Sequence, residues 1–175
     1  MARFPFSLSA TRARERFAEL YRAQRDPLYA YCLGMLGDAA AAEDVVQLAF
    51  ERAWRRRHVF DLRRGSPRAW LYAIARNAAR DELRRRGRHA LPVEELPERG
   101  AKDARLEDLE HGELRAAVLA LPERDRELIV LRYWADLPDA EIARISGLSR
   151  SNVSTRIGRA LRRLRGVLEA DDGSA

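Results

Sequence analysis

Apolar residues recur every three or four positions along most of this chain, and the runs of β-branched residues typical of strands are absent. This spacing predicts helices, because residues three and four apart lie on one face of a helix. We expect a first helix over 12–36 and a second over 40–57. A third opens at Ser66 and Pro67, an N-cap residue followed by a proline at the first helical position. These helices form the first domain of an all-α protein, over residues 12–88.

One apolar side of each helix is expected to form the core of this domain. The residues on these sides are Phe17, Leu20, Leu28, Tyr31, Met35, Val45, Val46, Ala49, Phe50, Ala53, Trp54, Leu71, Ile74 and Ala78. Trp70 is assigned to the core as well, rather than to base stacking. Cys32 follows Tyr31 in the helical pattern, which predicts a buried thiol. A single cysteine excludes an intramolecular disulfide and is compatible with a reduced cytosolic setting.

The composition changes after the third helix. Residues 87–104 carry two prolines, two glycines and an acidic bias. This composition indicates a flexible linker, whose bounds we set at 89–104. A second small helical domain follows over 105–168, with a helix over 105–120 and another that starts near 121–122. The apolar residues of that helix are Leu128, Ile129, Leu131 and Trp134. The tail 170–175 is predicted to be disordered.

Residues 136–165, DLPDAEIARISGLSRSNVSTRIGRALRRLR, have the layout of a helix-turn-helix. Gly147 stands where the first helix needs a residue with positive φ, and Ser149 is placed to cap the second helix. The second helix is expected to bury Val153, Ile157, Leu161 and Leu164. Residues 142–168 contain seven arginines and no acidic residue. A basic outer helix suits the major groove of DNA, although a hairpin with a solvated basic face has the same layout.

The overall charge also favours a polyanionic partner. The 175 residues carry a formal net charge of +6. No apolar run is long enough to span a membrane and the start has no signal-peptide core, which predicts a cytoplasmic protein without membrane insertion. The histidines are scattered, and no phosphate loop, metal-ligand spacing or Ser-His-Asp pattern is present. We therefore expect no catalytic residue, no metal, no cofactor and no small-molecule substrate.

Three segments resemble those of a known family. Residues 42–54, AEDVVQLAFERAW, and 70–88, WLYAIARNAARDELRRRGR, resemble region 2 of bacterial sigma factors, and residues 121–164 resemble region 4. Their order, spacing and direct linker are similar to the extracytoplasmic-function group of the sigma-70 family. The resemblance implies a non-enzymatic protein that binds core RNA polymerase and recognises the −10 and −35 elements of promoter DNA. It also implies an anti-sigma factor, which we expect between the domains, over 43–47 and part of the second domain.

The resemblance assigns roles to residues of the first domain. Glu43, Asp44 and Gln47 correspond to the polymerase-docking helix, where carboxylates and an amide can pair with arginines. The residues implied in −10 binding are Phe60, Arg63, Arg64, Arg76, Asn77, Arg80 and Arg84. The loop 58–66 matches one that captures a flipped base, so Phe60 either stacks on that base or anchors the loop in the core. Asp81 is placed to brace Arg84 or Arg85.

In the second domain the resemblance places the −35 element against the recognition helix. The residues implied are Arg150, Ser151, Asn152, Thr155, Arg156 and Arg159. The first two turns are expected to contact base edges, and Arg159, Arg162 and Arg163 to contact phosphates. Leu48 and Ser154 depart from the family, which often has an acidic and a basic residue at these positions. The alternatives are a stand-alone helix-turn-helix regulator, with the first domain for sensing or dimerisation, and an RNA-binding adaptor.

Overall fold

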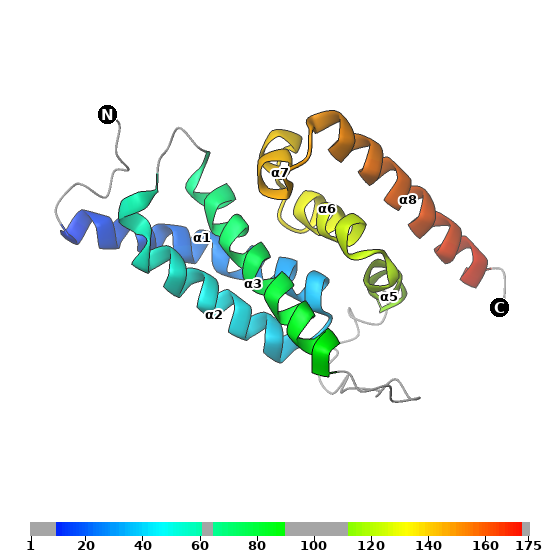
Figure 1. Ribbon diagram of the computed structural model, residues 1–175, viewed down its shortest axis with the longest axis horizontal. Helices are drawn as coiled ribbons and strands as arrows, with labels where there is room; N and C mark the ends of the chain where they lie inside the picture. Colours follow the sequence, from blue (N-terminus) through cyan, green and yellow to red (C-terminus); the bar gives the residue numbers. More distant parts are fainter. Residues whose placement is uncertain (1–9, 61–64, 90–111, 173–175) are drawn as a thin grey trace.

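The computed structural model describes residues 10–60, 65–89 and 112–172, and every regular element in these ranges is helical (Figure 1). The elements are α1 (Ala10–Leu36), α2 (Ala39–Arg55), the 3₁₀ helix η2 (Arg57–Val59), α3 (Pro67–His89), α5 (Gly112–Ala120), α6 (Glu123–Tyr133), α7 (Asp139–Ser146) and α8 (Arg150–Asp172). The all-α prediction is therefore confirmed for the described part of the chain.

Helices α1, α2 and α3 pack on one another and form the first domain (Figure 1). Gly37, with φ of +69°, ends α1, and the side chain of Asp38 accepts a hydrogen bond from the Ala41 amide to cap α2. Ser66 caps α3 in the same way, with its hydroxyl 3.0 Å from the Ala69 amide nitrogen. Most of the predicted core residues are buried, and Phe17, Leu20, Trp54 and Ile74 are partly buried at its edge.

The second domain consists of α5 to α8, and α7 and α8 form the predicted helix-turn-helix. Gly147 ends α7 with φ of +73°, and the Ser149 hydroxyl accepts a hydrogen bond from the Asn152 amide at 3.2 Å. Ile142 and Val153 are fully buried where the two helices meet. Both local predictions, the left-handed glycine and the serine cap, are confirmed.

Two local predictions, the burial of Leu161 and the disorder of the tail from residue 170, were wrong. Leu161 is 38% exposed, and the neighbouring residue Ala160 is buried in the core instead of it. The buried positions of α8 are therefore spaced four, three and four, which keeps them on one stripe of the helix. Helix α3 ends at His89, one residue into the linker set at 89–104, and residues 90–104 lie outside the described residues, so the linker stays a prediction. Helix α8 continues to Asp172, into the expected tail.

The two domains pack directly against each other. Helix α6 lies on α1 and α3 in the middle of the molecule, and α8 forms the outer layer on the far side of α6 (Figure 1). The helices approach closely at Gly34 of α1, where a Cβ atom would lie 2.7 Å from Cγ1 of Val130 in α6. A single apolar core runs through both domains. We call this arrangement the closed state.

Candidate functional site

The polar face of α2 is open to solvent. Glu43, Asp44 and Gln47 are exposed, whereas Val45 and Val46, which lie between them in the sequence, are buried against the bundle. Helical periodicity produces this division, because the two valines turn inward as their neighbours turn outward. Leu48 is half-buried and packs against the core. The three predicted docking residues thus share one accessible surface.

The polar and basic side chains of α3 form two groups, one exposed to solvent and the other in contact with the second domain. Asn77 is exposed. Arg84 is 62% exposed and pairs with Asp81 at 2.9 Å, which is the bracing role predicted for Asp81. In contrast, the side chains of Arg76 and Arg80 are only 14% and 24% exposed, because α6 covers them.

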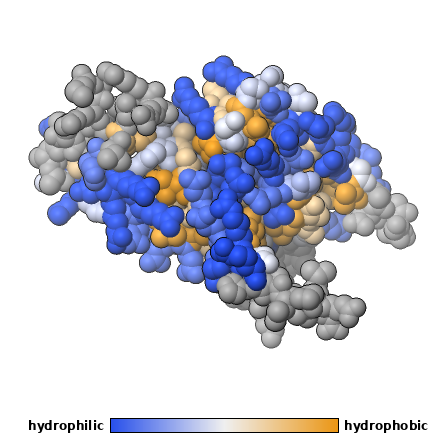
Figure 2. Space-filling view, in the orientation of Figure 1, coloured by the Kyte–Doolittle hydropathy of each residue, from blue (hydrophilic) through white to orange (hydrophobic). Residues whose placement is uncertain are grey.

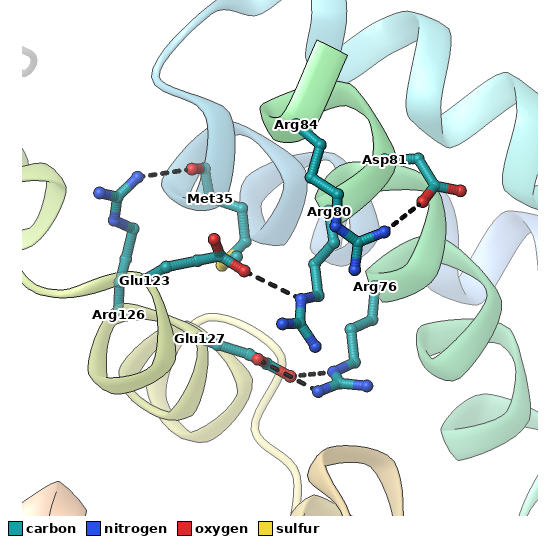
Figure 3. Close-up of polar contacts among 8 residues, drawn as sticks. All are labelled: Met35, Arg76, Arg80, Asp81, Arg84, Glu123, Arg126 and Glu127. Carbon is teal, nitrogen blue, oxygen red and sulfur yellow. Dashed lines mark hydrogen bonds and ion pairs between the residues drawn. The ribbon is translucent and has the colours of Figure 1, made fainter. Parts of the chain in front are cut away.

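Two ion pairs join α3 to α6 across the closed state (Figure 3). Arg76 donates hydrogen bonds to both carboxylate oxygens of Glu127, whose side chain is only 2% exposed. The Nε of Arg80 donates to Glu123 at 2.9 Å. Sequence reasoning missed these pairs. Their signal was a matched spacing, since the arginines and the glutamates are each four residues apart and both pairs lie on one helix face.

Other polar contacts reinforce the same interface. Arg126 donates to the carbonyl oxygens of Met35 in α1 and of Leu119 and Leu121 in its own domain, and burial lowers its pKa. The Ser66 hydroxyl at the start of α3 donates to Glu141 of α7 at 2.7 Å. If the domains separated, Arg126 would lose the Met35 carbonyl oxygen and Ser66 would lose Glu141, unless water or another molecule replaced them.

The loop before α3 has its aromatic residue turned inward. Phe60 is only 5% exposed, and its ring centroid lies 4.9 Å from that of Trp70. The structure therefore favours the anchoring interpretation of Phe60 over base stacking in this state, and it places Trp70 against the core as expected. Arg63 and Arg64 lie outside the described residues.

The first turns of α8 point away from the rest of the protein. Arg150, Ser151, Asn152, Thr155 and Arg159 are exposed. Arg156 is half-buried instead, because it pairs with Asp125 of α6 at 2.9 Å. Asp125 also lies 3.5 Å from Arg163. The predicted −35 surface is thus accessible in the closed state, except that Arg156 is held by its own domain.

One side chain in α1 and one in α3 have pKa values shifted by their surroundings. Cys32 is buried, as predicted, and burial raises the pKa of its thiol to about 12. Hydrogen bonds from Arg85 and Arg86 lower the pKa of Glu82 to about 2. Glu82 therefore balances part of the positive charge at the end of α3, where hydrophilic residues gather on the surface (Figure 2).

Within the described ranges, no cluster of histidine, cysteine and carboxylate side chains could hold a metal ion. In the same part of the chain, no helix combines the length and apolarity that a membrane crossing requires. The notable features of the described surface are therefore the polar face of α2, the basic face of α3 and the exposed start of α8.

Comparison with known proteins assigns both halves of the chain. Residues 20–89 match the family described as Sigma-70 region 2, and residues 111–164 match Sigma-70, region 4. The chain is 31% identical over 169 residues to the sigma factor SigW of Bacillus subtilis, covering 86% of this chain and 88% of that protein. It is 30% identical over 157 residues to the sigma-E factor of Streptomyces antibioticus, covering 89% and 86%.

Two solved structures are similar over both domains. The sigma factor RpoE from Bartonella quintana, solved with the anti-sigma factor NepR, has 26% identity and a TM-score of 0.73, with 90% of this chain and 99% of that one covered. CnrH, solved with the cytosolic domain of CnrY, has 29% identity and a TM-score of 0.71, with 90% of each chain covered.

Proposed function

Since this chain belongs to the extracytoplasmic-function group of the sigma-70 family, we propose that it directs core RNA polymerase to promoters by holding the −10 element with its first domain and the −35 element with its second. The observation that carries the proposal is the exposed start of α8. It presents five polar or basic side chains from a helix-turn-helix that has no acidic residue between 142 and 168. Such a surface suits a phosphate-lined major groove.

Polymerase docking is assigned to the face formed by Glu43, Asp44 and Gln47. These three exposed side chains offer two carboxylates and an amide, which suit a partner surface rich in arginine and backbone donors. A double substitution, Glu43→Gln with Asp44→Asn, keeps the shape of this face and removes its charge. We expect it to weaken binding to core polymerase, measured by co-purification, without changing the helical content of the chain.

The −10 element is assigned to Arg76, Asn77, Arg80 and Arg84 of α3, together with the loop 58–66. The arginines suit the phosphates, and the Asn77 amide can both donate to and accept from a base edge. Because Arg76 and Arg80 pair with α6 in the closed state, this assignment requires the second domain to move away.

The −35 assignment separates contacts to bases from contacts to phosphates. Asn152→Ala is expected to change the preference between variant −35 sequences, by about 1–3 kcal/mol at one base pair. Arg163→Ala is expected to weaken binding to all sequences alike and to reduce its salt dependence. Arg156→Ala should also alter preference, although the loss of its pair with Asp125 makes Asn152 the sharper test. An equal, base-independent loss in Asn152→Ala and Arg163→Ala would contradict these roles.

Reconstitution with core polymerase tests the function as a whole. We expect the chain alone to bind promoter DNA poorly and the reconstituted enzyme to initiate at defined start sites in run-off transcription. Tight sequence-specific binding by the free chain, without stimulation of transcription, would instead identify a stand-alone helix-turn-helix regulator.

An anti-sigma factor is proposed as a second protein partner, since RpoE of Bartonella quintana was solved with one. We assign it to a position between the domains, over the exposed face at 43–47 and part of the second domain, where it would block the polymerase by occupying the same surface. Because the domains pack directly on each other in the closed state, this position requires them to separate. Hydrogen exchange on a complex isolated from the native cell tests this surface. Protection limited to either end of the chain would contradict it.

A further inference from the structure

The closed state sets two glutamates of α6 against two arginines of α3. Glu127 is almost completely buried and Arg76 is 14% exposed, so this pair is shielded from water by both domains. A carboxylate and a phosphate make the same kind of hydrogen bond to a guanidinium group. Arg76 therefore cannot bind a DNA backbone while Glu127 occupies it, and Arg80 has less of its guanidinium group to offer a phosphate while Glu123 holds its Nε.

The remainder of this interface is built for close contact. Gly34 lets α1 approach Val130 of α6 to a distance that no Cβ atom would tolerate. Arg126 reaches across to the Met35 carbonyl oxygen at 2.9 Å, and Arg68 reaches the Ala135 carbonyl oxygen at 2.5 Å. Apolar packing, hydrogen bonds to backbone carbonyl oxygens and ion pairs thus occur together at this interface.

The closed state covers part of one proposed DNA surface and leaves the other exposed. Helix α6 covers Arg76 and Arg80, whereas the first turns of α8 stay exposed on the opposite side of the second domain (Figures 1 and 3). A closed chain therefore offers its −35 surface and hides part of its −10 surface.

We propose that this chain inhibits itself through an exchange of anions: in the closed state, Glu123 and Glu127 hold the α3 arginines that the −10 phosphates hold in the open state. The proposal rests on the function assigned above, specifically on the role of α3 in −10 binding. Opening of the interface then precedes engagement of the −10 element, while the −35 element can be bound before it.

A reversible crosslink tests the effect of closure. The Cβ positions of residues 34 and 130 lie 3.6 Å apart, within the usual disulfide range of about 3.5–4.5 Å. The variant carries Gly34→Cys and Val130→Cys, with Cys32→Ala to remove the native thiol. We expect the disulfide to form readily in the free chain, because the closed state holds the two positions together.

The crosslinked chain is then assayed on two DNA probes from a promoter mapped by transcript starts: a duplex with the −35 element alone and a forked DNA with the −10 element alone. Oxidation should weaken binding to the forked DNA roughly fivefold or more, within the range of ordinary coupling between sites, and leave the −35 duplex unaffected. Reduction should restore binding. Equal binding to the forked DNA before and after oxidation, or failure of the disulfide to form, would overturn the proposal.

Charge removal tests the exchange itself in the uncrosslinked chain. Glu123→Gln with Glu127→Gln should raise the affinity of the free chain for the forked −10 DNA roughly fivefold or more. The matched control is Glu113→Gln with Glu169→Gln, which removes the same charge from exposed positions of the same domain. An increase no larger than in the control would show a general charge effect and contradict the exchange.

The outcomes separate this proposal from the proposed function. If the unmodified chain and core polymerase give no specific initiation, the function fails. If they initiate normally while the crosslink and the glutamate variants leave −10 binding unchanged, only the self-inhibition fails. The crosslink keeps both glutamates in place, so it remains informative if the Glu127 variant folds poorly.

Discussion

Replacement of Gly34 by alanine separates the stability of the first domain from that of the closed state. The added Cβ would lie 2.7 Å from Cγ1 of Val130, well inside ordinary van der Waals contact. Val130 is fully buried, and its β-branched side chain is stiff at χ1, so it cannot easily turn aside. Overpacking of this kind costs about 1–3 kcal/mol.

The helix propensity of alanine acts in the other direction and stabilises α1 by up to about 1 kcal/mol. This gain is present in both the open and the closed states, so it cancels from the equilibrium between them. The steric term remains. We therefore expect Gly34→Ala to shift that equilibrium toward the open state by about 1–3 kcal/mol, or roughly 5- to 150-fold.

Small-angle X-ray scattering measures the shift as a larger radius of gyration of the free chain. Gly166→Ala is the matched control, because it adds the same methyl group to α8 at an exposed position with nothing within 4 Å. The control should gain stability without expanding. A second substitution, Val130→Ala, removes the clashing atom and should restore compactness to the Gly34 variant, which a double-mutant cycle quantifies. Unchanged scattering from Gly34→Ala would show that the contact between residue 34 and Val130 does not control the equilibrium between the closed and open states.

The remaining predictions concern single groups. Because burial raises the pKa of Cys32 to about 12, a thiol reagent at pH 8 should label the native chain only after denaturant is added, and rapid native labelling would contradict the burial. Because the folded pKa of Glu82 is lowered to about 2, its charged form stabilises the fold above the ordinary pKa of 4.5, and this contribution is lost as the pH falls from 4.5 toward 2. Glu82→Gln should therefore be less stable than the original chain at neutral pH in urea unfolding, and most of this difference should be lost near pH 2. Gly147→Ala should lower the unfolding free energy by about 1–2 kcal/mol, because φ of +73° strains alanine although the site is open, and an unchanged urea midpoint would contradict this.

Most of the local structure could be predicted from the sequence. The ends of the two helices in the helix-turn-helix are clearly marked in the sequence, since Gly147 and Ser149 each satisfy a backbone requirement that few other residues meet. The buried stripes were also predictable, because periodicity marks the apolar side of each helix. Leu161 shows the limit of that rule, since Ala160 and Leu161 are both apolar and only the packing of α8 decides which of them is buried.

The packing of one domain on the other was not predictable in the same way. Periodicity identifies an apolar face but not the element that covers it. Arg76 and Arg80 were assigned to DNA on a resemblance that describes each domain separately, and a basic residue looks the same in sequence whether its partner is a phosphate or a distant glutamate. Gly34 also gave no indication in the sequence of its contact with α6, because a glycine near the end of a helix has several ordinary explanations.

The acidic residues of α6 form ion pairs with two basic helices at once, α3 and α8. Successive residues of a helix are separated by about 100°, so Glu123 and Glu127 lie on one side of α6 and Asp125 lies nearly opposite. The first side pairs with Arg80 and Arg76 of α3, and the second pairs with Arg156 and Arg163 of α8. The two sets of pairs are independent, since Asp125 holds α8 within the second domain and the glutamates hold that domain to the first. Opening can therefore release the α3 arginines while the helix-turn-helix keeps its own support.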